Sequence, residues 1–143
     1  FISDSCCSFG KKRPGIYRLT VPTGSGKTLS SLRYALSHAA EYGKKRIIFI
    51  IPLLSVLEQN SKDIHKYLDA EAMILEHHSN LVTYDESKDE LDARELLTET
   101  WGAPVIISTL FQLLHILFLH KTSAVRRMNA LCDSVIIIDE EQS

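Results

Sequence analysis

Two clusters of polar residues have the types and spacing needed to bind a nucleoside triphosphate. The first is the segment Val21–Thr28, with the sequence Val-Pro-Thr-Gly-Ser-Gly-Lys-Thr. Its glycines let the backbone turn so that several N–H groups face one phosphate, and a helix beginning behind them adds positive partial charge. Lys27 would reach the β- and γ-phosphates, and Thr28 would place its hydroxyl on Mg²⁺. The strict pattern has Gly six residues before Lys27, where Val21 stands, so this is a variant loop. The residues predicted to bind ATP are Thr23, Gly24, Ser25, Gly26, Lys27 and Thr28.

The second cluster is a pair of acids that directly follows the apolar run Val135–Ile138. Asp139 would bind Mg²⁺ through the hydration shell of the ion, because Mg²⁺ keeps several of its waters. Glu140 would orient or deprotonate the attacking water, a role that phosphoryl transfer gives to one residue. Apolar strands that end in acids are common, so this interpretation depends on the pairing with the loop at Lys27.

Strands and helices alternate along the chain in the pattern of an α/β protein. The expected strands are Gly15–Val21, Arg46–Ile51, Ala72–Leu75, Pro104–Ser108 and Ser134–Ile138. The expected helices are Thr28–Tyr42, Ser55–Leu68, Glu90–Trp101, Leu110–His120 and Ser123–Leu131. Apolar strands joined by helices predict a mostly parallel sheet with helices on both faces. In such sheets ligands bind beyond the carboxyl ends of the strands, where both polar clusters are expected to lie.

The composition indicates one folded domain. The 143 residues are 45% hydrophobic and 24% charged, with six Gly and four Pro, which excludes a disordered, collagen-like or disulfide-scaffold protein. The net charge of −2 gives no reason to expect a polyanion, although residues 1–60 carry nine basic and three acidic side chains. Three cysteines, two of them adjacent, favour a reducing compartment. Since no targeting or membrane-spanning segment is evident, a cytoplasmic protein without a membrane partner is expected.

Several motifs together indicate a family. The Pro-Thr-Gly-Ser-Gly-Lys-Thr loop and the Asp-Glu-x-Gln box at 139–142 resemble superfamily 2 helicases of the DExH/DExQ kind. Ser3-Asp4-x-Cys6, 14–22 and 29–36 further resemble the CRISPR-associated helicase-nucleases of type I interference systems. The resemblance covers nearly the whole chain and implies a RecA-like P-loop NTPase domain, the first of two motor domains. It also implies ATP and Mg²⁺ as cofactors, single-stranded DNA as substrate, and a CRISPR RNA-guided surveillance complex as partner.

The resemblance assigns roles to further residues. The segment 50–60 resembles motif Ia, in which Pro52 and Ser55 would contact the backbone of single-stranded DNA, and Ser108 and Thr109 resemble the next DNA-contacting motif. Ser55 follows a strand and opens a helix, so its hydroxyl could hold a phosphate; capping of a helix explains these hydroxyls equally well. Gln142 would face the γ-phosphate and couple hydrolysis to movement of the second domain. Glu141 departs from the small or apolar residue expected there, which affects local packing more than chemistry.

The resemblance also indicates which parts of such a motor the chain lacks. There is no His-Asp dipeptide for a metal-dependent nuclease centre, and no second RecA-like domain follows. Residues 1–143 are therefore expected to be the first RecA-like domain of a larger protein, with weak Mg-ATP binding and very slow hydrolysis. Two alternatives stay open: an RNA helicase or other DExH translocase, and a nucleotide-dependent binding module that switches shape without translocating.

Overall fold

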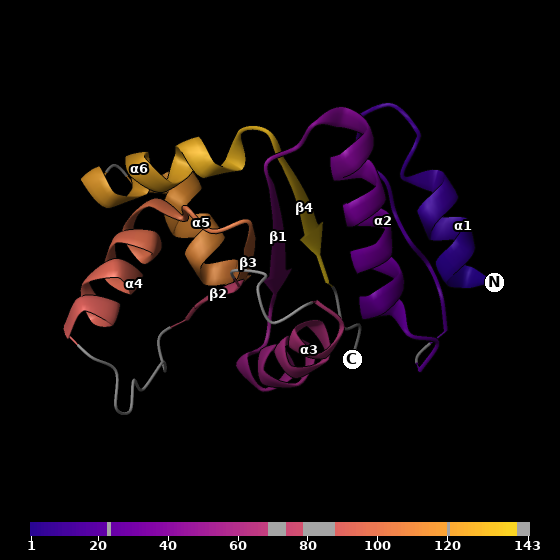
Figure 1. Ribbon diagram of the computed structural model, residues 1–143, viewed down its shortest axis with the longest axis horizontal. Helices are drawn as coiled ribbons and strands as arrows, with labels where there is room; N and C mark the ends of the chain where they lie inside the picture. Colours follow the sequence, from indigo (N-terminus) through magenta and orange to yellow (C-terminus); the bar gives the residue numbers. More distant parts are fainter. Residues whose placement is uncertain (23, 69–73, 79–87, 120, 140–143) are drawn as a thin grey trace.

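The strands in the described part of the chain end at one edge of the sheet that they form. The computed structural model describes residues 1–22, 24–68, 74–78, 88–119 and 121–139. Within these residues four strands form a sheet in the order β2-β3-β1-β4, and every neighbouring pair is parallel. The strands are β1 (Arg46–Ile51), β2 (Ile74–His77), β3 (Val105–Thr109) and β4 (Ser134–Ile138). Because they are parallel, the residues that follow their carboxyl ends gather at the same edge (Figure 1).

Helices cover both faces of this sheet (Figure 1). On one face lie α2 (Lys27–Tyr42) and α3 (Leu54–Tyr67), and on the other lie α4 (Lys88–Thr100), α5 (Leu110–Phe118) and α6 (Thr122–Leu131). The predicted class, an α/β fold with a parallel sheet between two layers of helices, is therefore confirmed.

The central strand β1 supplies both halves of the core. Successive side chains of a strand point to opposite faces. Ile47, Phe49 and Ile51 accordingly pack against α2 and α3, whereas Ile48 and Ile50 pack against α5 and its neighbours. These five residues are between 0% and 4% exposed, so the run Ile-Ile-Phe-Ile-Ile is a strand buried on both faces, as its composition predicts.

The helix α1 (Ile2–Phe9), which was not predicted, lies beside α2 (Figure 1). Its contacts with α2 are polar as well as apolar. Arg33 Nη1 donates to Asp4 Oδ1 at 2.7 Å, and Ser37 Oγ donates to the carbonyl oxygen of Cys7 at 2.8 Å. Cys6, between Asp4 and Cys7 in α1, is buried. The helix is thus held by residues about thirty positions away, which a local pattern does not reveal.

The strand predicted over Gly15–Val21 is absent, and this prediction was wrong. The segment has no regular structure, and Ile16 is fully exposed. The ring of Tyr17 packs edge-on against Phe9 at 4.9 Å between centroids, and its hydroxyl donates to the carbonyl oxygen of Arg13 at 2.6 Å. β-branched and aromatic residues favour a strand only where neighbouring strands or helices bury them, and here these side chains meet α1 and solvent.

The other predicted elements are present with small shifts. β1 and β4 have the predicted bounds, and the remaining elements begin or end within two residues of expectation. Residues 72, 73 and 120, at the ends of two predicted elements, lie outside the described residues. The elements that carry the two polar clusters are therefore where the sequence places them, except for the segment that leads into the loop.

Candidate nucleotide-binding site

The predicted phosphate-binding loop stands at the beginning of α2. Gly24 and Gly26 have φ values of 76° and 75°, a conformation that side chains other than glycine disfavour. A Cβ at either position would meet no atom within 4 Å. Gly26 is the N-cap of α2, so the helix begins directly behind the turn, where the first N–H groups of a helix have no acceptor within the helix itself. Thr23 lies outside the described residues.

Ser25 forms hydrogen bonds within the loop. Its hydroxyl donates to the carbonyl oxygen of Pro22 at 2.6 Å, and its backbone N–H points to the same oxygen at 3.3 Å. Both hydrogen-bond donors of Ser25 are therefore bonded to Pro22.

Lys27 and Asp139, the central residues of the two predicted clusters, are in direct contact. Lys27 Nζ lies 2.8 Å from Asp139 Oδ1, and the side chains are 33% and 13% exposed. Asp139 is placed by the sheet, because its N–H donates to the carbonyl oxygen of Ile50 at 2.9 Å and so continues the pairing of β4 with β1. The structure thus brings the loop and the acid at the end of the last strand together, as the sequence predicts.

A third element joins them through Asn60 of α3. Asn60 Nδ2 donates to Asp139 Oδ2 at 3.2 Å, and Asn60 Oδ1 accepts from Thr28 Oγ1 at 3.3 Å. The side chain is buried, with 8% exposure. Lys27, Thr28, Asn60 and Asp139 therefore form one connected polar network, which we call the strand-end network.

The sequence analysis includes Asn60 in the segment 50–60 but gives it no role in the ATP site, although a signal for such a role exists. Leu57 and Ile64 of α3 are fully buried, and Asn60 stands three residues after the first and four before the second, on the same face of the helix. A polar amide on the core-facing side of an amphipathic helix requires polar partners. Those partners are separated from it by 32 and 79 residues in the chain.

The donor set of the strand-end network fits ATP with Mg²⁺. A lysine and the N–H groups at the start of a helix suit phosphate oxygens, and a hydroxyl with a carboxylate supplies the oxygen ligands that Mg²⁺ prefers. The space beside Gly24 and Gly26 adds backbone without side chains, which allows close approach of an anion. The charges also suit these ligands, because Lys27 is positive like the partner that a phosphate needs and Asp139 is negative like the partner that Mg²⁺ needs.

Two of the predicted DNA-contacting residues lie near the start of α3. Pro52 and Ser55 are both exposed. The N-cap of α3 is Leu53, and no side chain caps the helix. Ser55 therefore does not act as a helix cap. Its hydroxyl therefore stands at the surface within the first turn of α3, beyond the carboxyl end of β1.

The other two, Ser108 and Thr109, end the neighbouring strand. Thr109 pairs with Ile51 across the sheet and is the N-cap of α5, where its hydroxyl accepts from the N–H of Gln112 at 3.4 Å. Ser108 is fully buried, and its hydroxyl donates to the carbonyl oxygen of His77 at 2.7 Å. Thr109 is thus partly accessible at the edge that also carries Asp139, whereas the Ser108 hydroxyl holds β3 to β2.

His77 ends β2 at the same edge and is held neutral. The indole Nε1 of Trp101 donates to His77 Nδ1 at 3.0 Å, which requires an unprotonated nitrogen at that position. Burial, together with the charges of Arg127 and His78, lowers the pKa of His77 from 6.5 to about 4. Trp101 itself is fully buried, so this pair anchors the end of β2 in the core.

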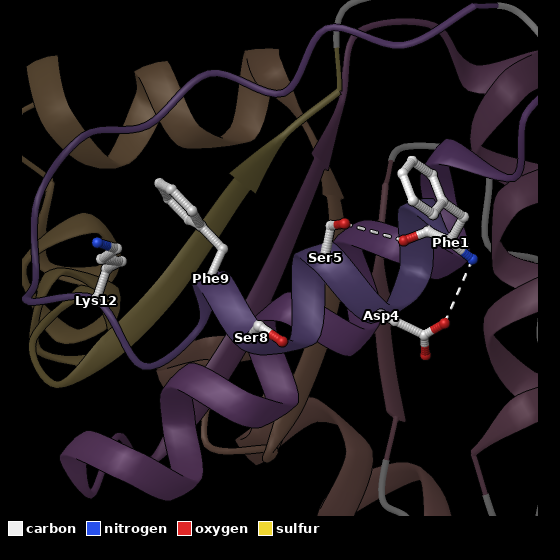
Figure 2. Close-up of a pocket in the computed structure, with 6 residues that line it drawn as sticks. All are labelled: Phe1, Asp4, Ser5, Ser8, Phe9 and Lys12. Atoms are coloured by element: carbon white, nitrogen blue, oxygen red, sulfur yellow. Dashed lines mark hydrogen bonds and ion pairs between the residues drawn. The ribbon is translucent and has the colours of Figure 1, made fainter.

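The predicted residues Glu140 and Gln142 lie outside the described residues. An open hollow elsewhere on the surface is lined by Phe1, Asp4, Ser5, Ser8, Phe9 and Lys12 of α1 and the turn after it (Figure 2). It contains none of the residues predicted to bind ATP, Mg²⁺ or DNA.

Comparison with protein families agrees with this geometry. A family model described as DEAD/DEAH box helicase matches residues 15–143, which include the loop, Asn60 and Asp139. The chain belongs to the DEAD/DEAH box helicase family. Membership in this family implies an ATP-binding domain of a nucleic acid helicase, and it confirms the RecA-like fold class and the helicase resemblance seen in the motifs.

A curated relative narrows the similarity within these helicases. Over 153 aligned residues the chain is 27% identical to the CRISPR-associated nuclease/helicase Cas3 of Haloferax volcanii. The alignment covers 91% of this chain and 16% of that protein, so this helicase domain spans about a sixth of the length of the relative. Among the described helices none is long and apolar enough to cross a membrane.

Proposed function

We propose that residues 1–143 form the first RecA-like motor domain of an ATP-dependent translocase that moves along single-stranded DNA and unwinds it during CRISPR interference. The observation that carries the proposal is the strand-end network, in which Lys27 contacts Asp139 at the end of β4 directly and Thr28 is joined to Asp139 through Asn60. The similarity to the Haloferax volcanii Cas3 protein supports the CRISPR context, and with it an RNA-guided surveillance complex as partner and a cytoplasmic location.

Each residue of the site would have its own role in binding ATP. The turn at Gly24–Gly26 and the first N–H groups of α2 hold phosphate oxygens. Lys27 would exchange its contact with Asp139 for the phosphates, and Thr28 and Asp139 would hold Mg²⁺. The bound ion would neutralise charge on the phosphates during transfer. Glu140 would orient the attacking water and Gln142 would report the γ-phosphate to the second motor domain.

DNA would bind along the same edge of the sheet. The adjacent strands β1 and β3 are followed by Pro52 and Ser55 at the start of α3 and by Thr109 at the start of α5. Ser108 stabilises this edge through its hydrogen bond to His77. Such contacts would be made mostly to phosphates, so DNA binding should weaken with salt and show little preference for sequence.

Measurement of ATP hydrolysis tests this function. In the complete protein that carries this domain, single-stranded DNA should stimulate hydrolysis and Lys27→Ala should abolish the stimulation. The chain 1–143 alone should turn over slowly, because in such motors the arginines of a second domain contribute about 10³–10⁵ in rate. Stimulation by RNA instead of DNA would make the protein an RNA translocase. Nucleotide binding without nucleic-acid stimulation would make it a binding module that switches shape.

A further inference from the structure

Asn60 connects the two residues that are predicted to hold Mg²⁺. Its amide stands between Thr28 of α2 and Asp139 after β4 and contacts both. The orientation of the amide follows from its partners. A carboxylate only accepts hydrogen bonds, so the Nδ2 group faces Asp139, and the Oδ1 atom is left to accept the hydroxyl hydrogen of Thr28.

The two hydrogen bonds of Asn60 leave oxygen lone pairs of Thr28 and Asp139 available to another ligand. When the Thr28 hydroxyl donates its hydrogen to Asn60 Oδ1, both lone pairs of Thr28 Oγ1 remain available to a cation. When Asn60 Nδ2 holds Asp139 Oδ2, the carboxylate cannot rotate freely, and Oδ1 stays on the side of Lys27. A metal ion held by the same two residues needs its oxygen ligands fixed in just such directions.

We propose that Asn60 is a positioning residue of the ATP site, which orients Thr28 and Asp139 toward Mg²⁺; the proposal rests on the nucleotide-binding function proposed above. A purely structural role makes a different prediction. The buried face of α3 continues through Leu57 and Ile64, and an apolar side chain of similar size at position 60 would extend that face without cost to packing. If Asn60 only held α3 in place, such a replacement would affect ATP with and without metal equally.

The test compares nucleotide binding in Mg²⁺ and in EDTA. Asn60→Leu keeps the branched shape of the side chain and removes both hydrogen bonds, and Asn60→Ala cannot overpack the site if the leucine variant fails to fold. The affinity of the chain 1–143 for ADP is measured by titration calorimetry in each condition, after thermal unfolding has shown that the variants fold. The matched control is Asn129→Ala, which removes an exposed amide from α6 on the opposite face of the sheet.

The expected result is a loss specific to the metal. In Mg²⁺ both Asn60 variants should bind ADP about 10-fold or more weakly, the effect of losing a hydrogen bond to a charged group, whereas in EDTA the change should stay below about 2-fold. The control should match the wild type in both conditions. Equal losses in Mg²⁺ and EDTA, or no loss in either, overturn the role of Asn60 while the proposed function stands. A wild-type chain that binds no ADP in Mg²⁺ overturns the function itself, and the inference with it.

Discussion

The contact between Lys27 and Asp139 predicts that one substitution will change nucleotide affinity in opposite directions with and without Mg²⁺. In the structure the two side chains satisfy each other at 2.8 Å. A nucleotide that arrives without metal must separate them and then place its phosphates near a carboxylate. Asp139→Asn keeps the shape of the side chain and removes its charge, so it should release Lys27 for the phosphates.

The size of this effect follows from the distance and the exposure. Two unit charges 2.8 Å apart attract by about 1.5 kcal/mol in bulk water, and pairs open to solvent usually measure below about 1 kcal/mol. Lys27 is one-third exposed, so we take about 1 kcal/mol, which corresponds to a factor of about five in affinity. In EDTA the Asn variant should therefore bind ADP about five times more tightly than the wild type. In Mg²⁺ it should bind at least about ten times more weakly, because a charged ligand of the ion is lost.

The assay is a titration of the chain 1–143 with ADP, performed in EDTA and in Mg²⁺. Asp133→Asn is the matched control. Asp133 precedes the same strand, its pair with Lys45 is long at 3.9 Å and well exposed, and its positive φ of 53° suits asparagine. This variant should bind ADP as the wild type does. If Asp139→Asn weakens binding in EDTA as well, the ion pair does not compete with phosphate and the reasoning is refuted.

Three further predictions concern the loop and the sheet edge. Gly26→Ala and Gly43→Ala both place a side chain at a positive φ with open space around it, so denaturant unfolding should show each destabilised by about 1 kcal/mol; only Gly26→Ala should also weaken ADP binding. Ser108→Ala removes the buried hydrogen bond to His77 and should cost about 1 kcal/mol by the same measurement, and an unchanged midpoint would contradict that contact. His77 has a pKa of about 4 in the folded chain against 6.5 when unfolded, so the unfolded chain binds more protons as pH falls. Its contribution to stability should be complete above pH ~6.5 and lost progressively toward pH ~4, by about 1–2 kcal/mol after allowance for the solvent that reaches the ring. His77→Asn, which can still accept from Trp101 but does not titrate, should flatten this part of the stability curve, and parallel curves for the two proteins would disprove the assignment.

The fold was most predictable where local signals decide the structure. β1 and β4 are short apolar runs bounded by polar or turn residues, and their bounds agree with prediction. The helix α2 ends at Gly43, whose φ of 63° is the left-handed conformation expected at such a stop. In these elements periodicity, end signals and burial all agree, so local sequence is sufficient.

Prediction failed where distant contacts decide the structure. The run Gly15–Val21 has the composition of a strand, but the structure gives it no neighbour in the sheet. Conversely, α1 contains serine, aspartate and cysteine, which are modest helix formers. It is stabilised by Arg33 and Ser37 of α2 and by His38 Nδ1, which contacts the carbonyl oxygen of Gly10 at 2.7 Å.

The candidate site divides in the same way. Lys27, Thr28 and Asp139 belong to recognisable motifs at predicted strand and helix ends, and the structure brings them together. Asn60 lies in the segment 50–60 that resembles motif Ia, but that resemblance gives it no role in ATP binding, because this role depends on the packing of α3 across two other elements. The roles of Glu140 and Gln142, and of the DNA-contacting residues, stay predictions.

The outer edge of β4 has a practical consequence for handling this domain. In the described part of the chain β4 pairs only with β1, and Ile136 and Ile138 are 40% and 56% exposed. A row of unsatisfied backbone groups beside isoleucine side chains is a template on which a second molecule can add its own strand. Concentrated solutions of the chain 1–143 should therefore self-associate through this edge, and a lysine substituted at Ile136 should keep the preparation monodisperse in light scattering without touching the strand-end network.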